Sequence, residues 1–560
     1  MLNREIYELD PQLNRLENNG VAEVKDDQSA QALRTLRYEL QTFVCDGEYE
    51  LGLDKILSTY LRNLGDGHEQ PGVWISGFFG SGKSHLAKML RALWTNQPFD
   101  DGVSARDIAD LPQEIKDHLK ELSIQAKRHG GLHAASGTLG SGANNNVRLA
   151  LLNIVFKSAG LPEQYHQARF VLWLHKQGIF EQVKTHVEAA DDNWEDELED
   201  LYVSSSIARA LLAIDSTLGD DVKQVRQLLR EQYPNVQDVT NQQMVDAIHD
   251  GEFPLTLIAL DEVQQYVGSD TEKAHQVQEV VETCCKHSKF KSKMLFVATG
   301  QSALSGMPNL QRLLGRFQIT VQLSDTDVES VIRKVILRKK ASARPHLEQV
   351  MQSHLGEISR QLRGTKIEHH RDDEKVMIAD YPLLPVRRRF WEKVLRIVDT
   401  TGTVSQLRNQ LKVIHEAAQA TADKPLGHVV PADFIYNQIS VNLIQTGVIS
   451  KEIAEIIGRL SAGDADDQLK SRILALVLLI GKLPTDPTAD CGVRATADML
   501  GDLLIDDLNQ GKDVIRTQVP KLLQELADEG LVMAMQTSTG TEYRLQTQES
   551  AQWYDTLRQE

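Results

Sequence analysis

The sequence GFFGSGKS, residues 77–84, has the residue types and spacing of a phosphate-binding loop. It fits the pattern G-x-x-x-x-G-K-[ST], and it lies between a short apolar strand-like run (73–76) and an amphipathic helix-like run (85–94). Glycines let backbone N–H groups face phosphate oxygens, and the helix N-terminus adds positive partial charge. We expect Lys83 to reach the β- and γ-phosphates of ATP and the Ser84 hydroxyl to bind Mg²⁺. The predicted nucleotide-contacting residues are Gly77, Phe78, Phe79, Gly80, Ser81, Gly82, Lys83, Ser84 and His85.

Two adjacent carboxylates, Asp261 and Glu262, end a second apolar run, LTLIAL. A strand that ends in an acidic turn is common on its own. Downstream of a phosphate-binding loop, however, this pair predicts the second half of a nucleotide site. Asp261 is then expected to hold Mg²⁺, usually through its water shell, and Glu262 to polarise the attacking water.

A third strand-like run, residues 293–301, ends in polar residues that could sense the γ-phosphate. The sequence does not choose between Thr299 and Gln301 for this role. Further along, Arg316 precedes a fourth strand-like run, ITVQL. An arginine there can reach the γ-phosphate of a neighbouring subunit and neutralise transition-state charge, although a surface salt bridge is the alternative.

These strands alternate with helix-like runs, which predicts an α/β fold with a parallel sheet and helices on both faces. The order of phosphate loop, carboxylate strand, sensor strand and arginine is that of AAA+ P-loop NTPases. We therefore predict an AAA+ ATPase core with N-terminal helices over residues 1–323, including a helical insertion at about 160–250. The Gly/Ser/Asn-rich stretch 135–146 is predicted to be a loop before a helix at 147–159.

The C-terminal half is predicted to begin with a helical lid, residues 324–445. Its first helix should span 324–341, and residues 381–419 should form two helices around a Thr-Gly turn. Arg408 is a candidate second sensor for the nucleotide, with a surface arginine as the alternative. The arginine triplet 387–389 favours a solvated face or a contact with an acidic partner over a nucleic-acid site.

Residues 446–546 have the order of a winged helix-turn-helix domain, with helix-like runs followed by two strand-like runs. Such a domain can bind DNA. However, residues 470–545 contain eight basic and eleven acidic side chains. This balance favours protein contact or weak DNA contact over sequence-specific reading.

The chain has 560 residues, a net charge of −18 and only four cysteines without zinc-type spacing. The charge argues against a generally basic nucleic-acid-binding surface. The N-terminus is charged where a signal peptide would be apolar, so we expect a cytoplasmic protein. Residues 547–560 read as the start of a truncated helix, and we expect the chain to be a fragment of something longer.

Several segments together resemble a known family. GFFGSGKSHLAKML, IALDEVQQYVG, ATGQSAL, LPVRRRFWE and TVSQLRNQLKVIHEA are similar to the large P-loop ATPase of BREX bacteriophage-exclusion systems, BrxC or PglY. The resemblance covers most of the chain and implies an ATPase core similar to the ORC/Cdc6-like branch of AAA+. It also implies a role beside a DNA methyltransferase, a phosphatase-like protein and accessory proteins in blocking phage replication.

The sequence thus predicts an ATP- and Mg²⁺-dependent ATPase that couples nucleotide state to assembly or remodelling of a DNA-associated complex. It is expected to form a homo-oligomer and to have no membrane contact. Two alternatives remain open: an ATP-bound scaffold with slow hydrolysis, and an ORC-like DNA-binding initiator or regulator. No base-reading motif distinguishes ATP from GTP.

Overall fold

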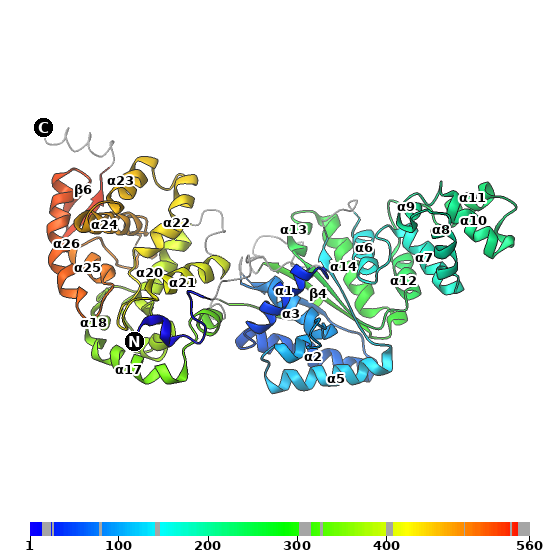
Figure 1. Ribbon diagram of the computed structural model, residues 1–560, viewed down its shortest axis with the longest axis horizontal. Helices are drawn as coiled ribbons and strands as arrows, with labels where there is room; N and C mark the ends of the chain where they lie inside the picture. The colour runs from blue at the N-terminus through cyan, green and yellow to red at the C-terminus, as the bar shows by residue number, and fades with distance from the viewer. Residues whose placement is uncertain are drawn as a thin grey trace. The chain divides into compact units, whose positions relative to one another are not determined.

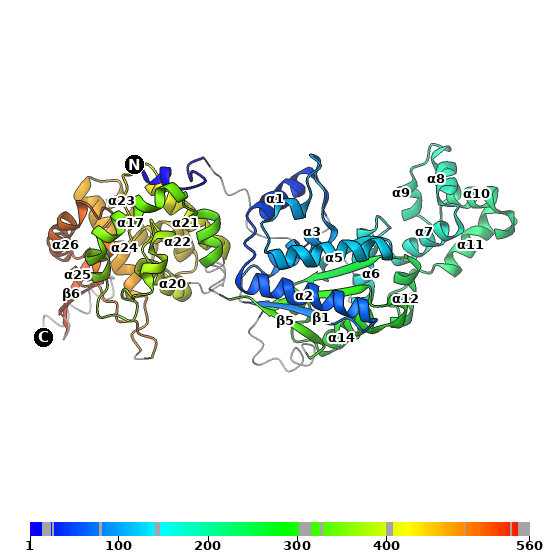
Figure 2. The same cartoon turned by 90° about the horizontal axis from the view of Figure 1, so that it is seen from below.

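The computed structural model describes residues 1–13, 24, 27–77, 81–139, 146–301, 315–324, 329–398, 407–486, 488–537 and 540–546, with the side chains of 407–409 excepted. The chain divides into two compact units (Figures 1 and 2). One unit comprises residues 21–327, and the other combines residues 1–20 with 328–560.

A five-stranded parallel sheet forms the centre of the first unit. Its spatial order is β2-β3-β4-β1-β5, so β4 separates the strand before the phosphate loop from the strand that carries the carboxylates. This confirms the predicted α/β class with a central parallel sheet. The strands are β1 Gly72–Gly77, β2 Leu132–Thr138, β3 Leu255–Asp261, β4 Met294–Gln301 and β5 Phe317–Gln322.

Helices cover both faces of this sheet, because alternate strand residues are apolar on either side. One face packs on α2 (Gly47–Asp66), α3 (Lys83–Thr95) and α5 (Gln113–His129), as Figure 2 shows. The other packs on α6 (Val147–Ser158), α12 (Asn241–Asp250) and α14 (Thr271–Lys286). The sheet is therefore packed between two hydrophobic cores, one on each face. These cores fix the positions of the carboxyl ends of the strands, from which the loops of the candidate site begin.

The stretch 135–146, predicted to be a loop, begins with strand residues 135–138, and its residues 140–145 lie outside the described residues. Residues 132–138 form β2, which pairs with β3 in parallel register, and α6 begins at Val147. The sequence LHAASGT contains small residues and lacks the β-branched run that marks a buried strand. Its pairing with β3 and the packing of α6 on it make it a strand, and neither is visible locally.

Five helices between α6 and α12 have a hydrophobic core of their own. The short connections between them leave each apolar face covered by a neighbouring helix, and Figure 1 shows the group projecting from the sheet-bearing part of its unit. They are α7 (Tyr165–Gln177), α8 (Phe180–Glu188), α9 (Trp194–Glu199), α10 (Ser205–Ile214) and α11 (Val222–Gln232).

The second unit is mainly helical and ends in an antiparallel hairpin. The two helices predicted within 381–419 are confirmed as α20 (Pro385–Val398) and α21 (Leu407–Thr421). The helix predicted for 324–341 ends earlier, because its described part turns into a π-helix at Ile332–Ile336 and stops at Leu337. The remaining elements include α22 (Phe434–Gln445), α23 (Lys451–Ser461), α24 (Ala465–Gly481), α25 (Ala497–Leu504), α26 (Gly511–Asp528), β6 (Val532–Thr537) and β7 (Gly540–Leu545).

The first residues of the chain pack into this second unit, as a strap of residues 2–8. The Asn3 N–H donates to the Lys424 carbonyl at 2.9 Å, and the Glu8 N–H donates to the Arg338 carbonyl at 2.9 Å. Tyr381 donates its hydroxyl to Asn3 Oδ1 at 2.6 Å. Asn3, Ile6 and Tyr7 are almost completely buried. The strap is therefore part of this unit's core.

The arginine triplet is a structural network, and the solvated-face interpretation is wrong. Arg387 is fully buried and donates to the carbonyl oxygens of Val430 and Asp502. Arg388 and Arg389 form ion pairs with Asp380 and Asp373. Burying a guanidinium is tolerated when most of its donors are satisfied in this way, although Arg387 Nε has no hydrogen-bond partner among the described residues.

Candidate functional site

The phosphate-loop sequence connects the end of β1 to the start of α3, as its motif requires. Gly82 has a φ of 90°, a backbone conformation that favours glycine, and it caps the N-terminus of α3. At Gly77 an added Cβ would lie 2.2 Å from Ser81 Oγ, so a side chain there would collide with the loop. Ser81 is buried, and its carbonyl accepts a hydrogen bond of 2.9 Å from the Tyr49 hydroxyl. Phe78, Phe79 and Gly80 lie outside the described residues.

The structure brings Ser84 and Asp261, which are 177 residues apart, into contact. Ser84 Oγ donates to Asp261 Oδ1 at 3.1 Å. Adjacent ligands of an octahedral Mg²⁺ with bonds of 2.0–2.1 Å are about 2.9 Å apart. The pair therefore fits the separation of two neighbouring ligands around Mg²⁺ if Asp261 binds the ion directly, and Asp261 is also close enough to accept a hydrogen bond from a water molecule on an ion held by Ser84.

Thr299 holds the two carboxylate residues from the neighbouring strand β4. Its hydroxyl donates to Asp261 Oδ1 in a very short hydrogen bond. Thr299 Oγ1 also accepts a hydrogen bond of 3.0 Å from the Glu262 N–H. Thr299 is 1% exposed. The Thr299 hydroxyl thus orients Asp261 and Glu262. Thr299, rather than Gln301, is therefore the positioning residue of this pair.

Gln301 lies directly beside the phosphate loop, because its Cα pairs with Gly77 in the register of β4 and β1. Its backbone N–H donates to Gln264 Oε1 at 2.5 Å, which ties the end of β4 to helix α13 (Val263–Val267). The Gln301 side chain is partly exposed. Of the two residues at the end of β4, Gln301 is the one whose position leaves it available to a phosphate group.

Glu262 has an unusual backbone conformation at the start of α13. Its φ of 54° and ψ of 30° are left-handed, which costs a non-glycine residue on the order of 1 kcal/mol. The hydrogen bond from its N–H to Thr299 stabilises this conformation. The side chain is exposed, and Glu262 Oε1 accepts from Gln265 Nε2 at 3.3 Å. An exposed carboxylate held at the end of β3 can accept a proton from water.

Lys83 is partly buried at the start of α3. Burial lowers the pKa of Lys83, and the negative charges of Asp261 and Glu262 partly oppose this effect. The ammonium group is thus partly desolvated beside carboxylates, an environment in which a bound phosphate would favour its charged form.

His85 belongs to a group on the opposite side of α3 that includes the end of α1 (Ala30–Gln41). Its ring packs edge-on against Phe43 with centroids 5.8 Å apart, and burial lowers the pKa of His85. One turn further, Lys88 Nζ lies 2.6 Å from Glu39 Oε2 on α1. These contacts attach α1 to the helix that follows the phosphate loop.

Arg316 lies at the other end of the sheet from this site. Phe317, the next residue, pairs with Gly72 at the start of β1, whereas the phosphate loop follows Gly77. At about 3.3 Å per residue, these ends of β1 are roughly 17 Å apart. Arg316 Nε forms an ion pair of 2.9 Å with Glu282 on α14. Arg316 is therefore too far from the loop after β1 to contact a group that would bind there in the same chain.

The side chain of Arg408 lies outside the described part of the structure, and its backbone belongs to α21 in the second unit. Its assignment as a second sensor stays a prediction.

Sequence reasoning missed the residues that support the site without matching a motif. Tyr49 holds the loop carbonyl of Ser81, Gln264 holds the end of β4, and Thr138 lies beside Asp261 in the register of β2 and β3. Gln264 and Gln265 lie two and three residues after Glu262 in the sequence, which was a usable signal. Tyr49 and Thr138 gave none, because only the packing of α2 and the pairing of β2 bring them here.

No known family model matches the chain. Within the described residues, no helix combines the length and the apolar character needed to cross a membrane.

Proposed function

We propose that this protein is an ATP-binding and ATP-hydrolysing AAA+ component of a BREX-type phage-defence complex, which couples nucleotide state to assembly or remodelling. The observation that carries the ATPase proposal is the contact between Ser84 and Asp261 at 3.1 Å. It unites the phosphate-loop hydroxyl with the carboxylate at the end of β3, and these are the two groups that a nucleotide-bound Mg²⁺ requires.

The proposed mechanism assigns one task to each residue. Lys83 and the backbone of the loop bind and orient the phosphates. Mg²⁺, when bound to Ser84 and Asp261, neutralises charge that develops on the phosphate oxygens. Glu262 accepts a proton from the attacking water, and Thr299 keeps Asp261 and the Glu262 backbone in place.

The AAA+ assignment is supported by the order of elements and by Arg316. Strand β4, which ends in polar residues, lies between the loop strand and the carboxylate strand, and an arginine precedes β5 at the opposite end of the sheet. An arginine in that position is suited to a neighbour's site. The proposal therefore includes a homo-oligomer in which Arg316 acts in trans.

The partner proposal rests on the sequence resemblance and on the charges of the C-terminal helices and hairpin, which we propose form a winged helix. Several basic residues there are already paired: Lys470 with Glu525 and Glu529, Arg472 with Asp433 and Asp506, Arg494 with Asp490, and Arg516 with Glu357 and Asp502. This pairing favours contact with other defence proteins, such as the methyltransferase or the phosphatase-like protein, over sequence-specific DNA reading.

The proposal is tested by measuring nucleotide binding and phosphate release together, with and without Mg²⁺. Wild-type protein should bind ATP and release phosphate. Glu262→Gln should bind ATP and retain it, because the amide keeps the shape but cannot accept the proton. Lys83→Ala should lose binding. Tight binding without phosphate release by the wild type would instead support the ATP-bound scaffold, and absence of binding by the wild type would overturn the proposal.

A further inference from the structure

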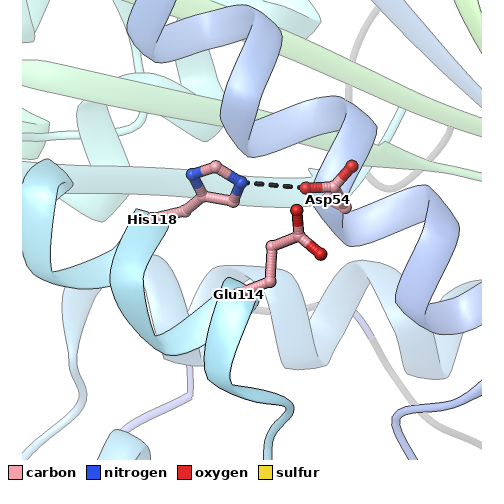
Figure 3. Close-up of side chains that lie close together, drawn as sticks. All are labelled: Asp54, Glu114 and His118. Atoms are coloured by element: carbon pink, nitrogen blue, oxygen red, sulfur yellow. Dashed lines mark hydrogen bonds and ion pairs between the residues drawn. The ribbon is translucent and has the colours of Figure 1, made fainter.

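A second cluster of ligand-type side chains lies away from the phosphate loop, between α2 and α5. It consists of Asp54 on α2 and of Glu114 and His118 on α5. Glu114 and His118 are four residues apart and so occupy the same face of their helix. Figure 3 shows the three side chains converging. One potential ligand atom from each lies within 4.8 Å of the others, and His118 Nε2 is 2.8 Å from Asp54 Oδ1.

The two helices that carry these groups are held firmly in the core. Leu53 on α2, and Ile115 and Leu119 on α5, are at most 1% exposed. They lie next to Asp54, Glu114 and His118 in the sequence, so the backbone that presents the cluster cannot shift far. Side chains placed on such rigid elements are pre-organised, which lowers the entropic cost of binding an ion.

The cluster contains more negative than positive charge. Within the described residues, His118 is the ion-pair partner of Asp54, and Glu114 forms no ion pair. Two carboxylates at this separation repel each other, and a bound cation would convert that repulsion into attraction.

We propose that Asp54, Glu114 and His118 bind a divalent transition-metal ion of the Zn²⁺ type. One imidazole nitrogen and two carboxylate oxygens suit Zn²⁺, whose bonds to such ligands are 2.0–2.2 Å. Mg²⁺ and Ca²⁺ favour all-oxygen ligand sets, so the imidazole selects against them. Three protein ligands leave a further position for water. Tetrahedral bonds of this length place ligand atoms about 3.3 Å apart, so the ligand atoms, which lie within 4.8 Å of one another, must approach by about 1.5 Å at most.

The ion would link α2 to α5 and so stabilise the covering layer of the sheet. Helix α2 also carries Tyr49, whose hydroxyl holds the phosphate loop at Ser81. The site is separate from Ser84 and Asp261, and the inference does not depend on the proposed ATPase activity.

The test titrates the nucleotide-free 560-residue chain with Co²⁺ and with Zn²⁺ in excess Mg²⁺, which competes for sites made only of oxygen ligands. Co²⁺ reports its coordination through its visible absorption, and Zn²⁺ affinity is measured by competition with a chelating dye. We expect one saturable site that raises the thermal transition of the sheet-bearing unit. Glu114→Gln and His118→Gln should each weaken binding tenfold or more and remove the thermal shift.

His129→Gln is the matched control, because His129 lies at the end of the same helix and outside the cluster. It should leave metal affinity unchanged. Circular dichroism should show all three variants folded, and Glu114 is exposed, so its substitution keeps the test valid if His118→Gln is unstable. Equal affinities in wild type and Glu114→Gln, or wild-type protein that binds neither ion, would overturn the proposal.

Discussion

At the scale of single residues, the hydroxyl of Thr299 connects the parts of the candidate site through two hydrogen bonds. It links β4 to the side chain of Asp261 and to the backbone of Glu262. The loop sequence and the carboxylate pair each have a recognisable motif, but a threonine at the end of an apolar strand has none. Its role follows from its place between the strands that carry the other two groups.

We predict that Thr299→Val lowers the rate of phosphate release and raises the Mg²⁺ concentration needed for half-maximal rate. Valine keeps the volume but removes the hydrogen bonds that orient Asp261. Losing such support costs roughly 10–100-fold in metal affinity or activity. The measurement is the ATPase rate against Mg²⁺ at saturating ATP. Thr299→Ser, which retains the hydroxyl, should recover most of the loss, and a wild-type Mg²⁺ profile for the valine variant would contradict the role.

A second prediction at this scale concerns His133 on β2. Burial, with a smaller contribution from Arg91, lowers the pKa of His133 to about 4. Its Nε2 lies 2.9 Å from Ser158 Oγ. The unfolded chain therefore takes up a proton near pH 6.5, while the folded chain resists it until about pH 4. Stability should fall as pH decreases between these values, by at most about 3 kcal/mol from this group.

The measurement is the denaturation midpoint of the sheet-bearing unit from pH 4 to pH 7. His133→Gln should flatten the dependence, because glutamine does not titrate in this range. His275→Gln is the control, since His275 is 67% exposed. An unchanged slope in His133→Gln would assign the acid sensitivity to other groups.

At the scale of elements, the sequence of the N-terminal strap, residues 2–8, does not predict which helices it packs against. Asn3 is completely buried, with its Oδ1 bonded to the Tyr381 hydroxyl and its Nδ2 donating to the His428 carbonyl at 3.0 Å. The strap and the helices that it touches are separated by more than 300 residues, and the strap is a structural part of the second unit.

We predict that Asn3→Ala destabilises the second unit and leaves the first unit unaffected. The substitution removes the hydrogen bonds of Asn3 with the Tyr381 hydroxyl and the His428 carbonyl. These two groups still bond to each other at 2.8 Å, so we expect a cost of about 0.5–1.5 kcal/mol for each bond lost. Calorimetry should show a lower transition for one unit and an unchanged ATP-stabilised transition for the other. Leu13→Ala is the control, since Leu13 is 78% exposed. If Asn3→Ala instead lowers the ATP-stabilised transition, the strap stabilises the first unit and the prediction is wrong.

At the scale of the whole molecule, the proposed action of Arg316 on a neighbouring subunit would make oligomerisation part of catalysis. Hydrolysis should rise more than linearly with protein concentration, because a complete site would exist only between subunits. Arg316→Ala should lose hydrolysis by a factor on the order of 10³–10⁵, with ATP affinity close to normal. Glu282→Gln removes the ion-pair partner without removing the guanidinium, and it should retain most activity.

Mixing Arg316→Ala with Lys83→Ala protein should restore part of the hydrolysis, since one subunit supplies the loop and the other the arginine. The measurement is the ATPase rate across mixing ratios at constant total protein. If both variants fold and associate, but no ratio recovers activity, Arg316 has a structural role.

The sequence by itself determined those parts of the protein that depend on near neighbours in the chain. Residues 77–84 predict a phosphate loop because glycine conformations and a helix start are local properties, and apolar periodicity predicts four of the five strands. Asp261 and Glu262 could be chosen because they directly follow a buried strand. The α/β class followed from this alternation.

Only the tertiary structure decided which distant groups meet. Strand order and register place Ser84, Asp261 and Thr299 together and put Arg316 at the opposite end of the sheet. The same is true of the arginine triplet, which looked solvated because charge favours exposure, but which finds buried carboxylate and carbonyl partners. The physical reason is that a residue's type sets the partners it needs, whereas long-range packing decides whether those partners are present.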